Sequence, residues 1–499
     1  MFVSWQVLCI ATIVVVIIFK RWKLYLLSWQ LPGPMAYLPI IGNGLTMMCD
    51  PKDMLTQILK ITDSHSSPLR IWIGPKLVIL VNDPDQLQTI MQSSKFTEKS
   101  FVYRFLEPFL GKGLFTSKGL KHKTERKLLQ HMFGPKFLEG YSKLFQKHAQ
   151  NLLQVMENNV GKEAFDVLHI LHECAFKATM DIIVEHKNDD TIDYTVYPKL
   201  VRRFYHIFSQ RILNFWMHWD LTYKLSRYFK EEQEMRDVVS KFSEVCKNRK
   251  LGETSERANS QTKLSEMPEK RETPSVVEMM FQMVEANPES LTEEEFIDHV
   301  VTFVATSQDT QSSAIAFTLM MMGIHKAIQN NVLEELYNVL GDSKELRLEN
   351  INKLQYLEMC IKESLRLFPL GPFLPRDVVQ SFNLGKWTIP VGCAVILGVY
   401  NVHRDPKHWE KPEEFYPEHF TQEAVAKRHP YAFLPFSNGP RRCIAQQYSY
   451  VNMKIVLANL LLNYEIECPF TMKNLKLTTD VSIRPIDGYM VNISKRVNL

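Results

Sequence analysis

The sequence predicts a mainly α-helical protein with a small β lobe, in which one large domain follows an N-terminal membrane anchor. Helical periodicity runs through most of the chain, β-rich runs are few, and an uncharged apolar stretch opens the sequence. The chain has 499 residues, of which 45% are hydrophobic and 23% are charged, as in ordinary globular proteins. No internal repeat or shift in composition divides the body, so we expect a single domain there.

The composition excludes several classes of protein. Its hydrophobic content is too high for a disordered chain, and a mean hydropathy of −0.17 is too low for a polytopic membrane protein. The 59 basic residues barely exceed the 55 acidic ones, so the charge gives no sign of a nucleic-acid partner. The eight scattered cysteines form no Cys-x-x-Cys pair, which excludes a readable zinc ribbon or thioredoxin-type site and indicates reduced thiols in a cytosolic environment.

Residues 1–19 form the predicted anchor. They contain no charged side chain, and as a helix they would extend about 28 Å, close to the hydrocarbon thickness of a bilayer. Lys20, Arg21 and Lys23 follow directly, which places the rest of the chain on the cytosolic side. A cleaved signal peptide is the alternative, but it would have a basic start and small residues at its exit. We therefore predict a retained, single-pass signal-anchor helix.

Residues 20–45 form a predicted basic, proline-rich hinge. The motif Leu-Pro-Gly-Pro at 31–34 stops a helix, because proline cannot continue one and restricts the residue before it. Residues 46–499 then form the predicted catalytic domain. Within it, residues 247–274 are rich in charge, serine and threonine, and we expect them to form a solvated loop.

Regular elements are expected throughout the body. Short β-rich runs on either side of Gly74 and Pro75 predict a hairpin, and strand-like segments return near 387–399. Helices are predicted over 135–156, 165–183, 275–284, 292–322 and 354–367. The segment 194–229 interleaves aromatic and basic residues, and it forms either an amphipathic helix pair against the core or a surface that dips into the membrane or admits substrate.

The helix expected from residue 292 has an unusual middle. Thr292 and Glu295 predict a capping box at its start. Eight consecutive polar residues run from 306 to 313, and each polar group buried without a partner costs about 1–3 kcal/mol. A polar cavity containing water would satisfy these groups, and hydroxyl groups that bond back to the helix would bend it there.

The decamer Phe-Ser-Asn-Gly-Pro-Arg-Arg-Cys-Ile-Ala at 436–445 carries the strongest chemical signal. A thiolate that ligates iron needs backbone N–H groups near its sulfur and a turn that brings the chain to the metal. Gly439 permits a tight turn, Phe436 can shield the sulfur, and Arg441 offers a guanidinium to a carboxylate. Cys443 directly precedes a predicted helix, whose N-terminus would stabilise an anionic sulfur. The alternative is an inert buried cysteine in a glycine-containing loop.

This decamer resembles the Phe-x-x-Gly-x-Arg-x-Cys-x-Gly loop of the haem-thiolate monooxygenases, the cytochrome P450 family, with Ala445 in place of the last glycine. The resemblance runs from Pro32 to the C-terminus and is greatest to insect microsomal members related to the fatty-acid ω-hydroxylases. It implies the cytochrome P450 fold, which is triangular and mainly α with a small β lobe. It also implies haem b with Cys443 as the iron ligand, held in a loop that includes Phe436 and Gly439.

A second motif, Glu-Ser-Leu-Arg at 363–366, matches the family's Glu-x-x-Arg helix. The spacing places Glu363 and Arg366 on one helix face, and apolar flanks predict that the pair is buried. In the family a later Pro-Glu-Arg-Phe motif adds a second arginine to this structural pair. This chain reads Pro-Glu-His-Phe at 417–420, so His419 is expected to donate a hydrogen bond in place of that arginine.

Asp309 and Thr310 match the acid–alcohol pair of the family's oxygen-binding helix, and the resemblance implies that they deliver protons during oxygen activation. Ser307 stands where the family usually has glycine, and it narrows the groove or adds a hydrogen-bond donor. Some fatty-acid hydroxylases of the family bind haem covalently through a glutamate at the position of Thr306. Since threonine cannot form that ester, we expect the haem to be bound non-covalently.

Basic residues complete the predicted haem site. Residues 119–126 resemble the family's Trp-x-x-x-Arg helix, with His122 in the tryptophan position. The resemblance makes Arg126 a partner of a haem propionate, together with Arg376 and Arg441. In the family this basic face also receives an acidic electron-transfer partner, whereas the simpler alternative is a solvated basic face.

These motifs together predict a monooxygenase that inserts one oxygen atom from O₂ into a small lipophilic substrate: a fatty acid, a hormone-like terpenoid or steroid, or a xenobiotic. NADPH–cytochrome P450 reductase would supply electrons, with cytochrome b5 as a further candidate donor. No glycine-rich dinucleotide motif follows a strand, in keeping with a separate reductase. The resemblance also implies a location at the endoplasmic reticulum membrane.

Two alternatives to this function remain. One is a haem-thiolate isomerase or dehydratase that needs no reductase, which the presence of Asp309 and Thr310 argues against, because such an enzyme needs no proton relay. The other is a haem-binding protein with little turnover, for which Ser307, His122 and His419 are the only hints.

Overall fold

The computed structural model describes residues 12, 19, 21–35, 41–47, 49–185, 196–240, 243, 273–341 and 345–496. The predicted anchor at 1–19 and the predicted loop at 247–274 therefore lie almost wholly outside the described residues. Within the described part of the chain, no helix has both the length and the apolar character that a membrane span requires.

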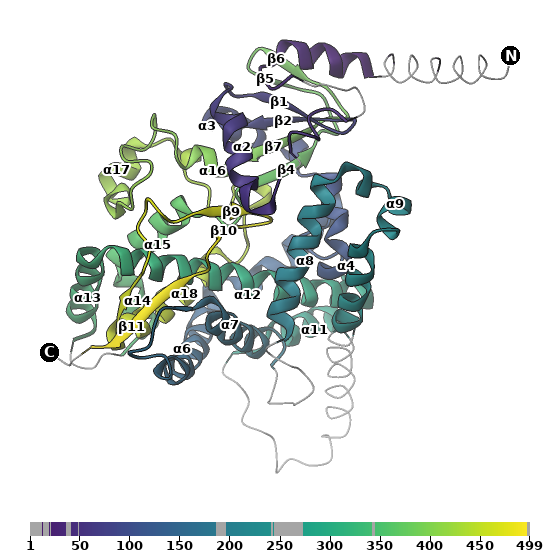
Figure 1. The fold of residues 1–499 in the computed structure, drawn as a ribbon. Helices are drawn as coiled ribbons and strands as arrows, with labels where there is room; N and C mark the ends of the chain where they lie inside the picture. The colour runs from purple at the N-terminus through teal and green to yellow at the C-terminus, as the bar shows by residue number, and fades with distance from the viewer. Residues whose placement is uncertain are drawn as a thin grey trace, which may run out of the picture.

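Helices form most of the molecule, as predicted (Figure 1). They are α2 Met54–Asp63, α3 Pro84–Gln92, α4 Glu107–Leu110, α5 Gly119–Leu129, α6 Pro135–Glu157, α7 Leu168–Ile183, α8 Val196–Leu213, α9 Asp220–Lys224, α11 Val276–Ala286, α12 Glu293–Ile324, α13 Lys326–Leu340, α14 Leu348–Lys353, α15 Gln355–Leu367, α16 Val399–Val402, α17 Gln422–Lys427 and α18 Gln446–Asn463. Residues 21–30 and 227–240 are also helical.

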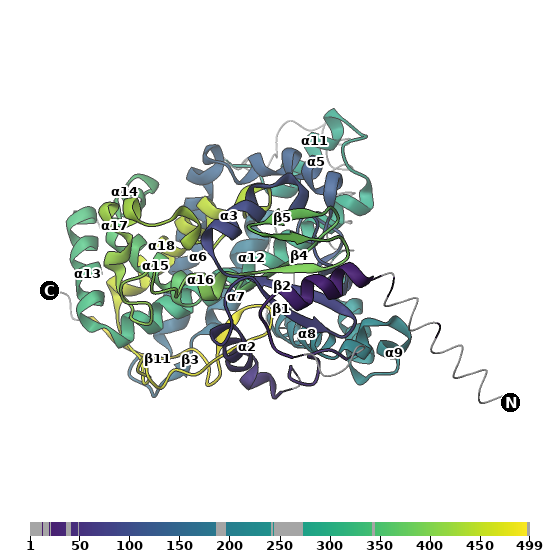
Figure 2. The ribbon, with the colours of Figure 1, turned by 90° about the horizontal axis from the view of Figure 1, so that it is seen from above.

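The strands form four small sheets, the largest of which has the order β1-β2-β7-β4. These four strands are β1 Leu69–Ile73, β2 Lys76–Val81, β7 Ala394–Gly398 and β4 Phe373–Asp377. The smaller sheets pair β3 Phe165–Asp166 and β8 Tyr464–Glu467 with β11 Met490–Lys495, β5 Phe382–Leu384 with β6 Trp387–Ile389, and β9 Leu477–Thr479 with β10 Ile483–Pro485. The large sheet and the β5–β6 hairpin form a β lobe beside the helices, seen from above in Figure 2.

Most predicted elements are confirmed. The predicted hairpin is β1–β2, which pairs antiparallel with Leu69 opposite Leu80. The helices predicted from 135, 275, 292 and 354 begin within one residue of those positions, and the capping box of Thr292 and Glu295 is present. The helix predicted from 165 was wrong at its start. Phe165 and Asp166 pair with β11 instead, because the long-range partner Val491 lies opposite Phe165.

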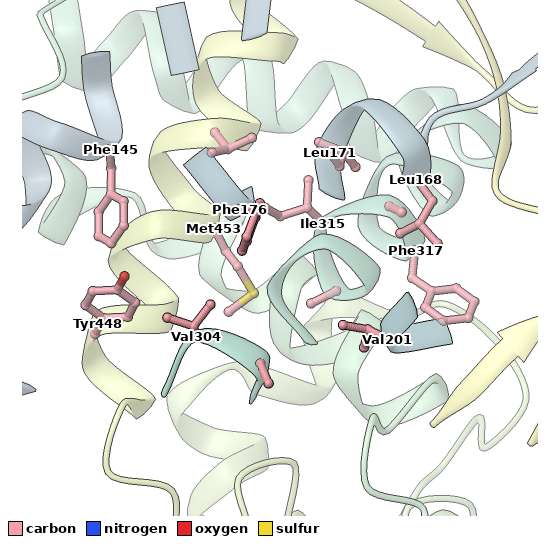
Figure 3. Close-up of a cluster of buried hydrophobic side chains, with 14 of the residues drawn as sticks. Phe145, Leu168, Leu171, Phe176, Val201, Val304, Ile315, Phe317, Tyr448 and Met453 are labelled. Atoms are coloured by element: carbon pink, nitrogen blue, oxygen red, sulfur yellow. The ribbon is translucent and has the colours of Figure 1, made fainter. Parts of the chain in front are cut away.

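The core of the helical body surrounds α12, which lies near the centre of the fold in Figure 1 and packs against α7, α15 and α18. Figure 3 shows side chains from five helices that meet there: Phe145 of α6, Leu171 of α7, Val201 of α8, Ile315 of α12 and Met453 of α18. All five are at most 3% exposed. Because α12 has neighbours on all sides, its polar residues must be satisfied by other side chains, by its own backbone or by a cavity.

The described part of the predicted hinge packs on the β lobe. Residues 21–30 are helical, and Leu27 and Leu31 are buried in a cluster with the strands. Arg70 of β1 donates hydrogen bonds to the carbonyl oxygens of Leu31 at 3.1 Å and Pro34 at 2.7 Å. These contacts fix the direction in which the chain enters the body.

The segment 194–229, rich in aromatic residues, combines features of a helix pair packed on the core and of a surface that meets the membrane or the substrate. Phe204 of α8 and Tyr223 of α9 are buried in the core, as an amphipathic helix pair requires. Trp219 and Leu225, in contrast, are 52% and 84% exposed. The segment therefore has a buried aromatic face and an exposed apolar tip; Tyr194, at its start, lies outside the described residues.

Candidate active site

A cavity of about 510 Å³ is lined by residues from α5, α8, α12, the β lobe and the loop before α18. Six predicted site residues line it: Arg126, Thr310, Arg376, Phe436, Arg441 and Cys443. Asp309 and Gly439 are not among the lining residues, and neither are the predicted structural residues Glu363, Arg366 and His419.

The loop at 436–445 folds tightly around the Cys443 thiol. The N–H of Cys443 donates to the carbonyl oxygen of Phe436 at 2.9 Å, which closes the loop. Gly439 has φ +68°, and a Cβ at this position would collide with the carbonyl oxygen of Met91. Glycine is therefore required here both for the backbone conformation and for the close approach of α3. The turn leaves the thiol on the wall of the cavity.

The thiol of Cys443 is exposed at the cavity wall rather than packed in the core, and its surroundings partly offset the cost of removing a thiolate from bulk water. Burial raises the pKa of the thiol, while the N–H of Ala445 and the charges of Arg126 and Arg442 act in the opposite direction. Arg126 is fixed beside the loop by donating to the carbonyl oxygen of Arg442 at 2.5 Å. The loop thus offers a sulfur ligand with cations and a backbone donor near it.

Basic side chains gather at one wall of the same cavity. Lys99 and Arg376 are buried, at 8% and 4% exposed. Burial, followed by the charges of Arg376 and Arg441, lowers the pKa of Lys99 well below its usual value. Burial is also the main cause that lowers the pKa of Arg441 to about 9 and that of His122 to about 3. Lys99 was missed by sequence reasoning, because it belongs to no motif and reaches the site only through an isolated bridge to Arg376.

Burial lowers the pKa of Arg441 and the charge of Glu98 raises it, but no ion pair balances this cluster within the described residues. In the described chain, no salt bridge joins a carboxylate to Lys99, Arg376 or Arg441. Arg441 donates from Nε and Nη2 to the carbonyl oxygens of Thr97 and Ser117, each at 2.8 Å, but its buried Nη1 has no partner among the described residues. Buried cations are costly without an anion. The two carboxylates of haem would supply that anion while Cys443 faced its iron, so the residues present fit this cofactor.

Glu363 and Arg366 form a closed network away from the cavity. All five N–H groups of Arg366 donate: to the two carboxylate oxygens of Glu363 at 2.8 and 2.7 Å, and to the carbonyl oxygens of His403, Pro412 and Glu414. Burial raises the pKa of Glu363, but hydrogen bonds from Arg366 and His419 outweigh it and the net direction is downward. The pair joins α15 to the segment around residues 403–420.

His419 contacts Glu363 as expected, with Nδ1 3.1 Å from Oε1. A second arginine also reaches this region from an unexpected position. Arg428 donates to the carbonyl oxygen of His419, and its guanidinium lies 3.8 Å from the ring centroid of Trp409. Burial lowers the pKa of Arg428 to about 10, while the charge of Glu363 raises it. Arg428 lies nine residues beyond the motif position, so no local pattern in the sequence indicates its role.

The polar run of α12 is satisfied mainly by the protein. The hydroxyl groups of Thr306, Thr310 and Ser312 donate to carbonyl oxygens four residues earlier at 2.7–2.8 Å. Ser307 accepts from Gln311 Nε2 at 2.8 Å, on the side of α12 that lines the cavity. The back-bonding predicted from the sequence is therefore present, whereas both polar atoms of the buried Gln308 side chain have no partner among the described residues.

Asp309 faces away from the cavity. Helix geometry turns each residue about 100° from the last, so the carboxylate next to Thr310 projects from another side of α12. Its Oδ1 lies 3.2 Å from Nε2 of His172 on α7, and both side chains are buried. Sequence reasoning missed His172, since the motif specifies the acid but not the neighbour that a different helix brings to it.

Comparisons with known proteins show the family of this chain. The family model for cytochrome P450 matches residues 32–493. Cytochrome P450 4c3 of Drosophila melanogaster is 32% identical over 96% of this chain and 91% of the relative, and cytochrome P450 4V2 of Homo sapiens is 30% identical over 96% and 93%. Cytochrome P450 4c21 of Blattella germanica is 27% identical over 94% and 93%. The chain therefore belongs to the cytochrome P450 family of haem-thiolate monooxygenases, among its members numbered 4.

Proposed function

We propose that this protein oxidises a small lipophilic molecule of fatty-acid, terpenoid, steroid or xenobiotic type, with electrons that NADPH–cytochrome P450 reductase delivers. The observation that carries the proposal is the cavity that presents Cys443, a buried cation cluster and the polar face of α12 together. Haem bound at Cys443 would supply the oxygen chemistry, in which the thiolate donates electron density that favours O–O cleavage.

The residues at the cavity wall have distinct proposed roles. Cys443 ligates the iron, and Phe436 and Gly439 shape the loop that holds it. Arg126, Arg376 and Arg441 bind the propionates, and we add Lys99 to this group because it is buried beside two of these arginines. Thr310 holds a proton at Oγ1 within reach of the cavity.

The haem is proposed to be bound without a covalent link. Thr306 lines the cavity, and its hydroxyl donates to the carbonyl oxygen of Thr302 at 2.7 Å. A threonine at this position carries no carboxylate that could form an ester. Release of unmodified haem b by acid extraction would support this proposal, and haem that stays attached to the chain would contradict it.

The substrate class follows from the rest of the wall. Apolar side chains from the β lobe, from the 3-10 helix Phe101–Phe105 and from α8 predominate there, including Ile71, Phe101, Phe208, Ile212 and Phe373. Such a wall favours apolar ligands over polar ones because binding removes apolar surface from water. Titrations with fatty acids of increasing length, terpenoids and steroids, followed by the spin-state shift of the haem, would rank these classes.

We further propose attachment to the endoplasmic reticulum membrane by the helix predicted at residues 1–19. Exposed Trp22, Trp29 and Trp219 support it, because indole rings favour the interface between membrane and water. Exposed Lys123 and Lys127 on α5 lie close to Arg126 at the cavity, which supports reductase docking on this face. Fractionation of the full chain and of a chain lacking residues 1–19 would test the attachment.

The central experiment tests the ligand. The reduced protein with CO should show the red-shifted Soret band of a thiolate ligand, and Cys443→Ala should lose it. Cys468→Ala is the matched control, because Cys468 is partly buried but does not line the cavity. A thiolate spectrum in Cys443→Ala would refute the assignment, and a wild type that forms no product with NADPH and reductase across the substrate panel would refute the monooxygenase proposal for these substrates.

The variant Thr310→Ala tests the proposed role of Thr310 in proton delivery. More peroxide and less product should be released per NADPH, since a positioned proton donor is lost. Thr318→Ala is the control, because Thr318 makes the same bond to the backbone of α12, with its Oγ1 2.8 Å from the Ala314 carbonyl, away from the cavity. Equal coupling ratios in the two variants would remove Thr310 from proton delivery.

A further inference from the structure

We infer that His172 is a positioning residue for Asp309: it holds the carboxylate turned toward α7 and out of the cavity. The inference rests on the proposed role of Asp309 in proton delivery. It begins from the 3.2 Å approach of His172 Nε2 to Asp309 Oδ1 between two buried side chains on α7 and α12.

The direction of the carboxylate follows from the surface of α12. Thr306, Ser307, Thr310 and Gln311 line the cavity at helical spacing, whereas Asp309 does not. α7 and α12 pack closely against each other along this stretch. The position of His172 on α7 therefore decides where the Asp309 carboxylate rests.

The charges around Asp309 favour its ionised form. Burial raises the pKa of its carboxyl, but the contact with His172 and the charges of Arg484 and Arg202 outweigh that effect and lower it overall. The titratable groups that face it from the surrounding elements are His172 on α7, Arg202 and Tyr205 on α8, Arg484 on β10, and Tyr489 before β11. Of these groups only His172 is an ion-pair partner of Asp309 in the described chain.

The same geometry suggests a path for protons. Nε2 of His172 lies 3.2 Å from Oδ1 of Asp309, and Asp309 is not among the residues of α12 that line the cavity. For Asp309 to pass a proton to Thr310, its carboxylate must rotate from α7 toward the cavity. The strength of its contact with His172 therefore controls how readily that rotation occurs.

The experiment compares the pH profile of coupling, measured as product per NADPH, in wild type, His172→Leu and His172→Gln. In wild type, protonation of Asp309 should lower the coupling only at a pH below the ordinary carboxyl pKa of about 3.9. This fall in coupling is the acidic limb of the profile. His172→Leu removes the main opposing contact while burial remains, so the limb should move up by about one to three pH units. His172→Gln keeps an N–H donor and should restore most of the coupling at neutral pH.

Two further variants exclude a general effect of losing a buried histidine. His148→Leu is the matched control, because His148 Nε2 lies 3.0 Å from Asp181 Oδ2 and joins α6 to α7, but neither residue lines the cavity. His148→Leu should leave the limb in place. His172→Leu combined with Asp309→Asn should have the profile of Asp309→Asn alone, without the limb, because both changes act on one carboxylate.

A double-mutant cycle on unfolding of the purified protein gives a readout independent of turnover. The destabilisations from His172→Leu and Asp309→Asn should sum to clearly more than that of the double variant. Additive effects, or an unmoved pH profile in His172→Leu, would overturn the inference while wild-type activity leaves the proposed function intact. If wild type forms no product but the cycle is non-additive, the contact stands and the proposed function fails.

Discussion

Two groups of charged residues inside this protein differ in whether the chain itself balances their charge. Every N–H of Arg366 has an acceptor and Glu363 balances its charge, although Nε2 of the adjoining His419 has no partner among the described residues. In the second group Lys99 and Arg376 are buried and Arg441 is partly buried, none of them has a salt bridge to an acid in the described chain, and Nη1 of Arg441 has no acceptor there. A closed network stabilises the fold by itself, whereas an open one is suited to a ligand of opposite charge.

The largest expected effect comes from opening the closed network. Glu363→Ala leaves Arg366 as an uncompensated buried cation, and breaking such a pair costs about 3–5 kcal/mol. We expect a loss of this size in the free energy of unfolding, measured by denaturant titration, and a loss of the thiolate CO spectrum. Lys362→Ala is a control, since Lys362 is on the same helix, is partly exposed and pairs with Glu358, which keeps its second partner Lys454. Equal stability of the two variants would contradict the structural role of the pair.

Removing a charge from the cluster of Lys99, Arg376 and Arg441 should weaken haem binding without lowering the free energy of unfolding of the haem-free protein. Arg441→Met and Lys99→Met should accelerate haem loss, because a propionate loses its partner. In the haem-free protein the same changes should leave the free energy of unfolding unchanged or raise it, since an uncompensated buried cation is removed. Haem transfer to an acceptor protein measures the first effect and denaturant titration the second. A large loss of stability in the haem-free variants would show that the cluster is structural.

Acid should weaken the closed network through His403. Its Nδ1 lies 3.1 Å from the carbonyl oxygen of Arg366 and its Nε2 accepts from the N–H of Leu434 at 2.7 Å, which fits a neutral ring. Burial lowers the pKa of His403 to about 3, against about 6.5 in the unfolded chain. Only the unfolded state takes up this proton between those values, so stability should fall by about 1.4 kcal/mol per pH unit below pH 6.5.

The variant His403→Gln tests this pH dependence. Its free energy of unfolding should fall less steeply between pH 6 and 4 than that of wild type, whatever its absolute value. The exposed His169, changed to Gln, serves as the control. Equal slopes in wild type and His403→Gln would assign the acid sensitivity to other groups.

The smallest expected effect concerns Arg428, which reaches the Glu363 network from outside its motif. Arg428→Ala removes a cation–π contact with Trp409 and a hydrogen bond to the carbonyl oxygen of His419. A loss of about 1–2 kcal/mol is expected. Exposed Lys427→Ala should change stability much less. If both variants are equally stable, His419 alone completes the network around Glu363.

The sequence by itself determined what local spacing can specify. The Cys443 loop, the Glu363–Arg366 pair and the capped start of α12 each depend on residues close together in the chain, so their geometry follows from turn and helix periodicity. The mainly α fold with a small β lobe followed from the same periodicities. The motif also predicted that His419, in place of an arginine, donates a hydrogen bond to the Glu363–Arg366 pair.

Only the tertiary structure decided which distant residues complete these motifs. Asp309 meets His172 across 137 positions, Lys99 joins Arg376 across 277, and Arg428 reaches the Glu363 network from outside its motif. Such contacts depend on how α7, the β lobe and the segment after α16 pack, and no local pattern encodes that packing. The physical reason is burial: charges brought out of water by the fold must find partners wherever the chain places them.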